Sequence, residues 1–186
     1  MKDKMINGIL FIIAGLGSIA VYVGLGPDGT GILDKAHTEK IAAYTLLTFP
    51  LAFMMTRNVT RNAFIDAGLL IIVVGLSLGL ISDAISSAEL GAESKSIAEA
   101  IMPTGWSIMY LGIFITGIGY LRTNLFPNWL SGLLSLTSFV MFAFLAISSP
   151  EQLSNNGDNI VPPLWMINSL VLVILGIFTI RRAELD

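Results

Sequence analysis

The sequence predicts an all-α membrane protein: a single integral membrane domain over residues 1–186 with six transmembrane helices. The first observation is composition, because 54% of the residues are hydrophobic and only 12% are charged, whereas about a quarter of the residues of a soluble domain are charged. The second is the recurrence of apolar stretches of about 20 residues, long enough for a helix to cross a bilayer core of roughly 30 Å. The third is the uneven placement of the basic residues.

The clearest span is residues 63–82, AFIDAGLLIIVVGLSLGLIS, in which Asp66 is the one charged residue. The first span is too long for a cleaved signal peptide and has no clear cleavage site, so we expect it to be retained. Pro50 lies inside the second span and predicts a kink, because proline removes a backbone donor and clashes with the preceding turn. The predicted spans are 6–25, 39–56, 63–82, 105–121, 129–148 and 164–180.

Two connections are long and polar. Residues 83–102 contain alanine, glutamate and spaced apolar residues, which predicts one or two short amphipathic helices on the membrane surface, ended by Pro103. Residues 149–163, SPEQLSNNGDNIVPP, are rich in turn-forming residues and predict a loop. Within the third span, Gly75 and Gly79 predict close packing against another helix.

The basic residues predict the orientation. With six spans, seven of the ten lysines and arginines lie on the termini and the even-numbered connections: Lys2, Lys4, Arg57, Arg61, Arg122, Arg181 and Arg182. The odd-numbered connections carry three lysines and nine acids. Because basic residues are retained on the cytoplasmic side, both termini are expected in the cytoplasm, with the chain in the inner (plasma) membrane.

Several function classes are disfavoured. The chain has no cysteine and a single histidine, His37, which excludes disulfides, iron–sulfur ligation and an intramembrane bis-histidine haem within the chain. No nucleophile, zinc-protease, P-loop or dinucleotide motif occurs. The net charge of −3 argues against nucleic-acid binding. We therefore expect no cofactor, no metal and no catalytic residues.

Asp66 is the candidate for an ion pathway, because a carboxylate at membrane depth is costly and often functional. It lies about one turn after the expected helix start, where the helix dipole and nearby Arg61 can stabilise it. The alternative is therefore a capping or interfacial role.

A polar cluster is expected in the outward halves of the spans. Polar groups in lipid need partners, so most of these side chains should face the interior of the bundle. They form either ordinary interhelical hydrogen bonds or a small pocket, in which Tyr44, Tyr110 and Asn168 are the candidate ligand-binding residues. The cluster consists of Tyr22, Tyr44, Thr45, Thr48, Ser82, Asp83, Trp106, Tyr110, Trp165, Asn168 and Ser169.

His37 lies three residues after Asp34 and two before Glu39, a combination that could bind zinc or copper. Such sites usually need three or four ligands, and only one histidine is present. The alternative is that Asp34 or Thr38 caps the second helix.

The C-terminal half resembles a known family. The resemblance is carried by residues 112–122, by FPNWLSG at residues 126–132, and by Pro163, Trp165 and the terminal LGIFTIRR at residues 175–182. Over roughly its last eighty residues the chain is similar to the small bacterial membrane proteins of the domain of unknown function 4386 family. That resemblance implies a six-helix membrane domain without an assigned chemistry.

Two functional hypotheses follow. In the first, the protein is a non-catalytic structural or accessory subunit that packs against other membrane subunits or against itself, as the glycine-lined helix faces indicate. In the second, it is a small transporter or receptor that binds an uncharged or lipophilic molecule in the outward polar cluster. A membrane enzyme is disfavoured, because one histidine and one intramembrane acid are poor material for acid–base chemistry.

Overall fold

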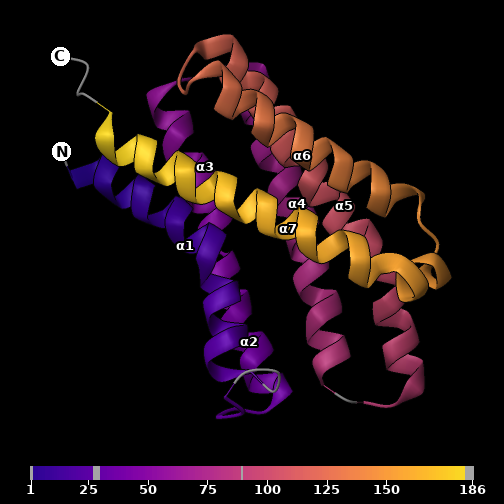
Figure 1. Cartoon of the computed structure of the whole chain (residues 1–186). Coiled ribbons are helices and arrows are strands. Elements are labelled where there is room, and N and C mark those ends of the chain that lie inside the picture. The colour runs from indigo at the N-terminus through magenta and orange to yellow at the C-terminus, as the bar shows by residue number, and fades with distance from the viewer. Residues whose placement is uncertain (1, 27–29, 89, 183–186) are drawn as a thin grey trace.

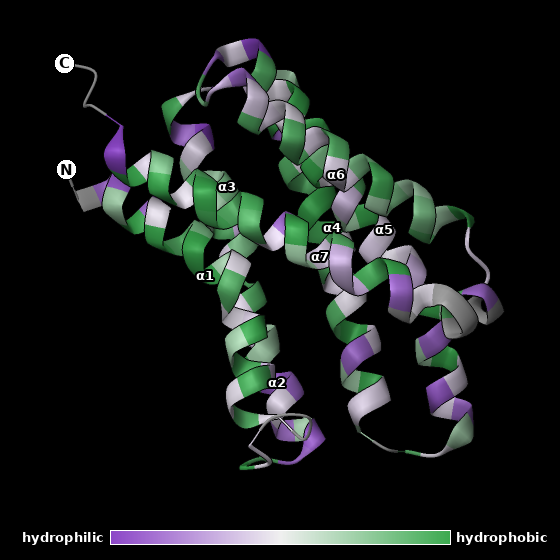
Figure 2. Cartoon of the chain, in the orientation of Figure 1, coloured by the Kyte–Doolittle hydropathy of each residue, from purple (hydrophilic) through white to green (hydrophobic). Residues whose placement is uncertain are grey.

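The computed structural model describes residues 2–26, 30–88 and 90–182, and these residues form helices and no strand (Figure 1). The predicted all-α class is confirmed. The helices are α1 (Lys2–Leu25), α2 (Lys35–Leu46), α3 (Thr48–Val59), α4 (Ala63–Ser87), α5 (Ala92–Thr123), α6 (Asn128–Ile147) and α7 (Pro150–Arg181). Figure 2 shows apolar residues along the middle of the helices and hydrophilic residues toward their ends, as a bilayer requires.

The prediction of six transmembrane helices is off by one. In the described residues, five helices are long and apolar enough to cross a membrane: α1, α4, α5, α6 and the Asn159–Arg181 part of α7. The predicted span 39–56 is instead divided between α2 and α3, each of 12 residues. The chain is therefore a multi-pass helical bundle of five long helices and one broken pair.

The break between α2 and α3 lies at Leu47, three residues before Pro50. Pro50 has no N–H to donate to the Leu46 carbonyl, and its ring crowds that turn, so the helix cannot continue regularly. Threonine hydroxyls bond carbonyls around the break: Thr48 donates to the Thr45 carbonyl at 2.5 Å, and Thr45 to the Ala42 carbonyl at 2.7 Å. The predicted kink is found here as a one-residue interruption, in which Leu47 stays in the right-handed α region (φ −62°, ψ −17°).

Helices α4 and α5 form an antiparallel hairpin held by glycines (Figure 1). A Cβ atom on Gly75 would lie 2.1 Å from the Met109 amide nitrogen, and one on Gly105 would lie 2.5 Å from the Gly79 nitrogen. Such contacts are possible only because glycine lacks a side chain, so the two backbones approach closely. The close packing predicted for Gly75 and Gly79 is confirmed.

Helices α1 and α7 form a second close pair. A Cβ atom on either Gly8 or Gly176 would lie 2.6 Å from the carbonyl oxygen of the other glycine. At the end of this pair, the Lys4 ammonium donates to the Arg182 carbonyl at 2.9 Å. The beginning of α1 and the end of α7 therefore lie side by side, as Figure 1 shows.

The core between these pairs contains an aromatic cluster, which we define as Phe11, Phe53, Tyr120 and Phe126. The Phe53 ring centroid lies 5.3 Å from that of Phe11 and 6.3 Å from that of Tyr120, and Tyr120 lies 5.0 Å from Phe126. The buried Tyr120 and Thr56 hydroxyls form a 2.6 Å hydrogen bond. The cluster thereby joins α1, α3 and α5.

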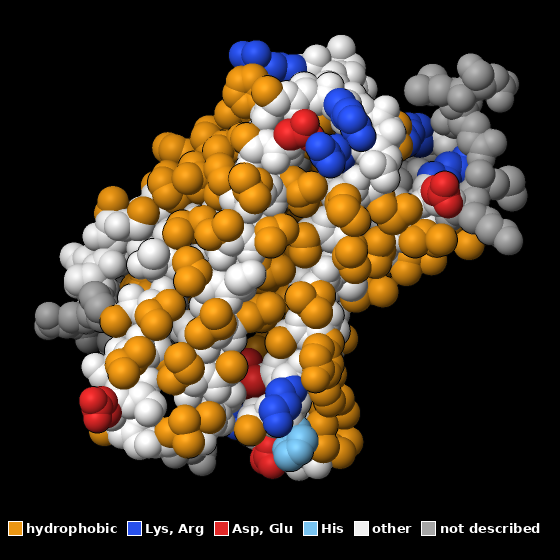
Figure 3. Space-filling view, turned by 180° about the vertical axis from the view of Figure 1, so that it is seen from behind, with side chains coloured by type: hydrophobic (Ala, Val, Ile, Leu, Met, Phe, Trp, Pro, Cys, Tyr) orange, Lys and Arg blue, Asp and Glu red, His pale blue; other side chains and the backbone are white. Residues whose placement is uncertain are grey.

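The bundle has two chemically different ends. The first, which we call the arginine end, contains the start of α1, the α3–α4 and α5–α6 connections and the end of α7. At this end Arg57 pairs with Asp66, and the Arg122 guanidinium lies 4.3 Å from the Phe64 ring centroid. The opposite end, which we call the acidic end, contains the α1–α2 and α4–α5 connections. In Figure 3 most blue side chains gather at the upper end and apolar side chains cover the middle.

Two predicted connections differ in the structure. Residues 83–87 continue α4 and residues from Ala92 belong to α5, so the polar segment extends a helical hairpin and forms no separate surface helices. Pro103 lies inside α5. Residues 150–163 form the first turns of α7 rather than a loop, because the Ser149 hydroxyl and the Gln152 side chain cap the helix start reciprocally.

Candidate functional site

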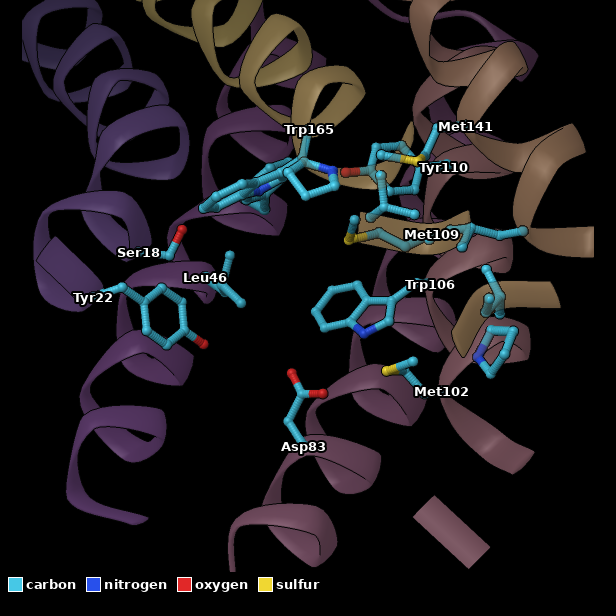
Figure 4. A pocket seen from close by; sticks show the side chains of 17 residues that line it. Ser18, Tyr22, Leu46, Asp83, Met102, Trp106, Met109, Tyr110, Met141 and Trp165 are labelled. Atoms are coloured by element: carbon cyan, nitrogen blue, oxygen red, sulfur yellow. The ribbon is translucent and has the colours of Figure 1, made fainter. Parts of the chain in front are cut away.

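A cavity of about 390 Å³ opens toward the acidic end of the bundle. All seven helices contribute to its 17 lining residues, and most of these are aromatic, methionine or aliphatic side chains (Figure 4). The first turns of α7, which sequence reasoning assigned to a loop, supply Leu153, Gly157 and Val161. A mostly apolar cavity of this size with a few polar groups is the usual form of a small-molecule site.

The two ends of the cavity differ in chemistry. Figure 4 shows Tyr110, Met141 and Trp165 at one end, and Tyr22, Asp83 and Met102 at the other. The Trp106 indole nitrogen is directed toward the Asp83 carboxylate. The cavity therefore changes from an apolar and aromatic interior to an acidic mouth.

A second carboxylate lies beside this mouth. The Tyr22 hydroxyl donates to Glu39 Oε2 at 2.7 Å, which joins α1 to α2, and Glu39 is close enough to Asp83 for their charges to interact. Because α1, α2 and α4 meet here, the acidic mouth depends on the tertiary fold.

Ser18 and Tyr110 are residues of the cavity wall that carry hydroxyl groups. Ser18 is 3% exposed, and its hydroxyl has no hydrogen-bond partner among the described residues. Tyr110 lines the deeper part of the cavity. An unsatisfied buried hydroxyl costs about 1–3 kcal/mol, so a partner from outside the chain would be favoured at Ser18.

The three candidate ligand-binding residues have different positions. Tyr110 is 6% exposed and lines the cavity. Tyr44 is 68% exposed and faces away from the bundle. Asn168 is buried but does not line the cavity. Its side-chain oxygen accepts hydrogen bonds from Thr137 and Ser138 of α6 at 2.9 and 3.1 Å, and its amide donates to the Leu164 carbonyl.

The predicted outward cluster therefore does not form one site. Asn168 forms interhelical hydrogen bonds, whereas five members of the cluster line the cavity: Tyr22, Asp83, Trp106, Tyr110 and Trp165. Sequence reasoning did not include Ser18, Gly157 or the cavity methionines. The available signal was the polarity of Ser18 within an apolar span, and nothing local distinguishes the methionines from core residues.

Asp66 lies in the first turn of α4, as predicted, and is exposed. Its partner is Arg57 of α3 rather than Arg61, and the cap of α4 is Asn62, whose side chain accepts from the Ile65 amide at 2.9 Å. This placement is that of an interfacial ion pair at the arginine end, remote from the cavity.

His37 and its two acidic neighbours do not come together. Asp34 caps α2 and bonds both the His37 amide and its ring, and these bonds hold the pKa of Asp34 below its usual value. Glu39 bonds Tyr22 instead. Within the described residues, no group of three or more histidine and acidic side chains has a metal-binding arrangement.

Comparison of the chain with protein-family models, with curated proteins and with solved structures finds no match. Membership of the domain of unknown function 4386 family therefore stays a prediction.

Proposed function

We propose that this chain is a small-molecule-binding protein of the inner (plasma) membrane, a receptor or transporter whose lipophilic ligand enters the cavity from the outward side. The observation that carries the proposal is a cavity of about 390 Å³ enclosed by all seven helices, with the unpaired Ser18 hydroxyl in its wall and the Asp83 carboxylate at its mouth. Apolar cavities with a few oriented polar groups bind ligands by burial and select them by those groups.

The proposal includes a topology of six crossings. Helices α2 and α3 contain 24 residues together, or about 36 Å of helix, enough for the roughly 30 Å core. A broken helix is tolerated at membrane depth where its backbone groups keep hydrogen-bond partners. At this break the Leu47 amide donates to the Ala43 carbonyl, and threonine hydroxyls donate to the Ala42 and Thr45 carbonyls. All five arginines then lie with both termini in the cytoplasm, and the acidic end faces outward.

Cysteine labelling tests this topology, since the native chain has no cysteine. In spheroplasts, we expect a membrane-impermeant maleimide to label Ile32→Cys and Leu90→Cys, because both positions are exposed at the acidic end. Asn58→Cys, exposed at the arginine end, should be labelled only after permeabilisation. Equal labelling of positions 32 and 58 in intact spheroplasts would show that α2 and α3 do not cross.

Filling the cavity tests ligand binding. A Cβ atom on Gly157 would make only ordinary contacts, the nearest being Leu153 Cβ at 3.9 Å, so Gly157→Leu should fold with its side chain in the cavity. We expect it to weaken binding of small lipophilic probes at least tenfold. The probes are benzyltrimethylammonium and its neutral isostere neopentylbenzene, measured in nanodiscs through the fluorescence of Trp106 and Trp165, which line the cavity.

Gly132→Leu is the matched control. Gly132 lies on α6, and no heavy atom is within 4 Å of a Cβ atom placed there, so the same substitution should leave binding within twofold of wild type. If Gly157→Leu binds both probes as wild type does, the cavity is not a binding site and the proposal is wrong.

The glycine faces that motivated the accessory-subunit hypothesis are largely used inside the molecule. Gly68, Gly75, Gly105 and Gly112 mediate the α4–α5 contact, while Gly8, Gly15 and Gly176 mediate the α1–α7 contact. These faces stabilise the bundle itself. They therefore give no separate support for packing against another subunit, and ligand binding is the function that the geometry favours.

A further inference from the structure

The mouth of the cavity has an unbalanced negative charge. Asp83 lies near the end of α4, partly buried, where it lines the cavity. The ion pairs Asp34–His37, Arg57–Asp66 and Lys95–Glu99 of the described residues do not include Asp83. No cation of the described chain therefore pairs with Asp83.

A second acidic side chain lies near Asp83. Glu39 lies close enough to interact with Asp83, and it accepts a hydrogen bond from the neutral Tyr22 hydroxyl. Lys35 and Lys40 of α2 also belong to this end, but neither lines the cavity, and Lys95 pairs with Glu99. The five arginines belong to the arginine end. A recess lined by one sign of charge and low-dielectric walls concentrates ions of the opposite sign.

The rest of the lining suits an organic cation rather than a metal ion. Trp106 stands beside Asp83, and Tyr22 and Trp165 add aromatic rings to the wall (Figure 4). Aromatic faces attract alkylated ammonium groups, especially where water is excluded. Hard metal ions need about six or more oxygen ligands, whereas methionine and aliphatic side chains dominate here.

We propose that the ligand of this cavity is a lipophilic monocation whose charged head lies beside Asp83 and against the face of the Trp106 ring, while its apolar body occupies the interior toward Tyr110. This inference rests on the proposed function and names its ligand class. The volume of about 390 Å³ is near the lower limit of the roughly 300–1,000 Å³ of small-molecule sites, which selects a compact amine or quaternary ammonium compound over a whole membrane lipid.

The charge of the ligand is tested with two probes of the same shape. Benzyltrimethylammonium and neopentylbenzene differ only in the central nitrogen or carbon atom and therefore in charge. In nanodiscs, with free probe concentrations fixed by equilibrium dialysis, we expect wild type to bind the cation at least tenfold tighter than the neutral isostere. Equal or tighter binding of neopentylbenzene would overturn the inference.

Asp83→Asn tests the residue. The amide keeps the size of the side chain and an acceptor for Trp106, so we expect cation binding to weaken at least tenfold and neopentylbenzene binding to stay within twofold. Asp83→Glu, which keeps the charge, should bind the cation within about fivefold of wild type. The control is Asp66→Asn, the same change on the same helix at the arginine end, which should leave both affinities unchanged.

The outcomes separate this inference from the proposed function. If both probes bind and Asp83→Asn does not affect the cation, the cavity binds ligands but not through their charge, and only the inference is wrong. If neither probe binds wild type, the proposed function fails together with it. The comparison of the two probes on wild type stays decisive even if Asp83→Asn does not fold.

Discussion

Gly75→Ile is expected to lower the free energy of unfolding by about 3 kcal/mol, at the upper end of the range for overpacked cores. A Cβ atom at position 75 would lie 2.1 Å from the Met109 amide nitrogen and 2.6 Å from its Cα atom. Both atoms belong to the backbone of α5, so no side-chain rotation can relieve the clash and the two helices must separate. The change is measured by SDS titration in mixed micelles, followed by circular dichroism.

Gly132→Ile is the control for this prediction, since a Cβ atom at Gly132 meets no heavy atom within 4 Å. Isoleucine has nearly the same helix propensity in both places, so the difference between the two variants isolates the helix–helix contact. We expect the control to change the free energy of unfolding by less than about 1 kcal/mol. Equal losses in both variants would contradict the close approach of α4 and α5.

The contact at Gly75 could be predicted from sequence because its signal is local. Two glycines one turn apart in an apolar span allow close packing whatever the partner helix is, and the structure supplies Met109 and Gly105 as neighbours. The membrane-spanning segments are predictable for a similar reason, since the bilayer imposes its thickness on each one separately.

The number of spanning helices was less predictable, because the effect of a proline on a helix depends on the residues around it. Pro50 indicates a disturbed helix, but whether the result is a kink or two helices depends on the bonds made around it. Here Thr45 and Thr48 donate to the carbonyls of Ala42 and Thr45. Residues 150–163 show the same limit. Their turn-forming composition favours a loop, while the Ser149–Gln152 capping box favours a helix.

The cavity could be predicted only in part. The sequence indicates how deep in the membrane a residue lies better than it indicates whether the residue faces the bundle interior or the lipid. A helix that is apolar on all sides has no strong polar stripe to orient it. Tyr44 and Tyr110 were therefore equivalent candidates, yet one is 68% exposed and the other lines the cavity. Ser18 and Asp83 belong to helices far apart in sequence, and only the tertiary fold brings them to one cavity.

Phe53→Ala is expected to lower the free energy of unfolding by about 3 kcal/mol, the lower limit for removal of a buried phenylalanine. Phe53 is fully buried and contacts Phe11 of α1 and Tyr120 of α5, so its removal leaves a void where three helices meet. We expect the thermal midpoint in detergent, followed by tryptophan fluorescence, to fall in parallel.

Met54→Ala is the control for Phe53→Ala, because it removes a large apolar side chain that faces outward instead of into the core. Met54 is the next residue of α3 but is 44% exposed on the outer surface of the bundle, so lipid replaces most of what its side chain contacts. Because lipid tails are as apolar as the protein core, a membrane helix gains little from burying apolar surface and depends on close packing instead. We therefore expect less than about 1 kcal/mol for Met54→Ala, and similar losses at both positions would show that the aromatic cluster does not hold α1, α3 and α5 together.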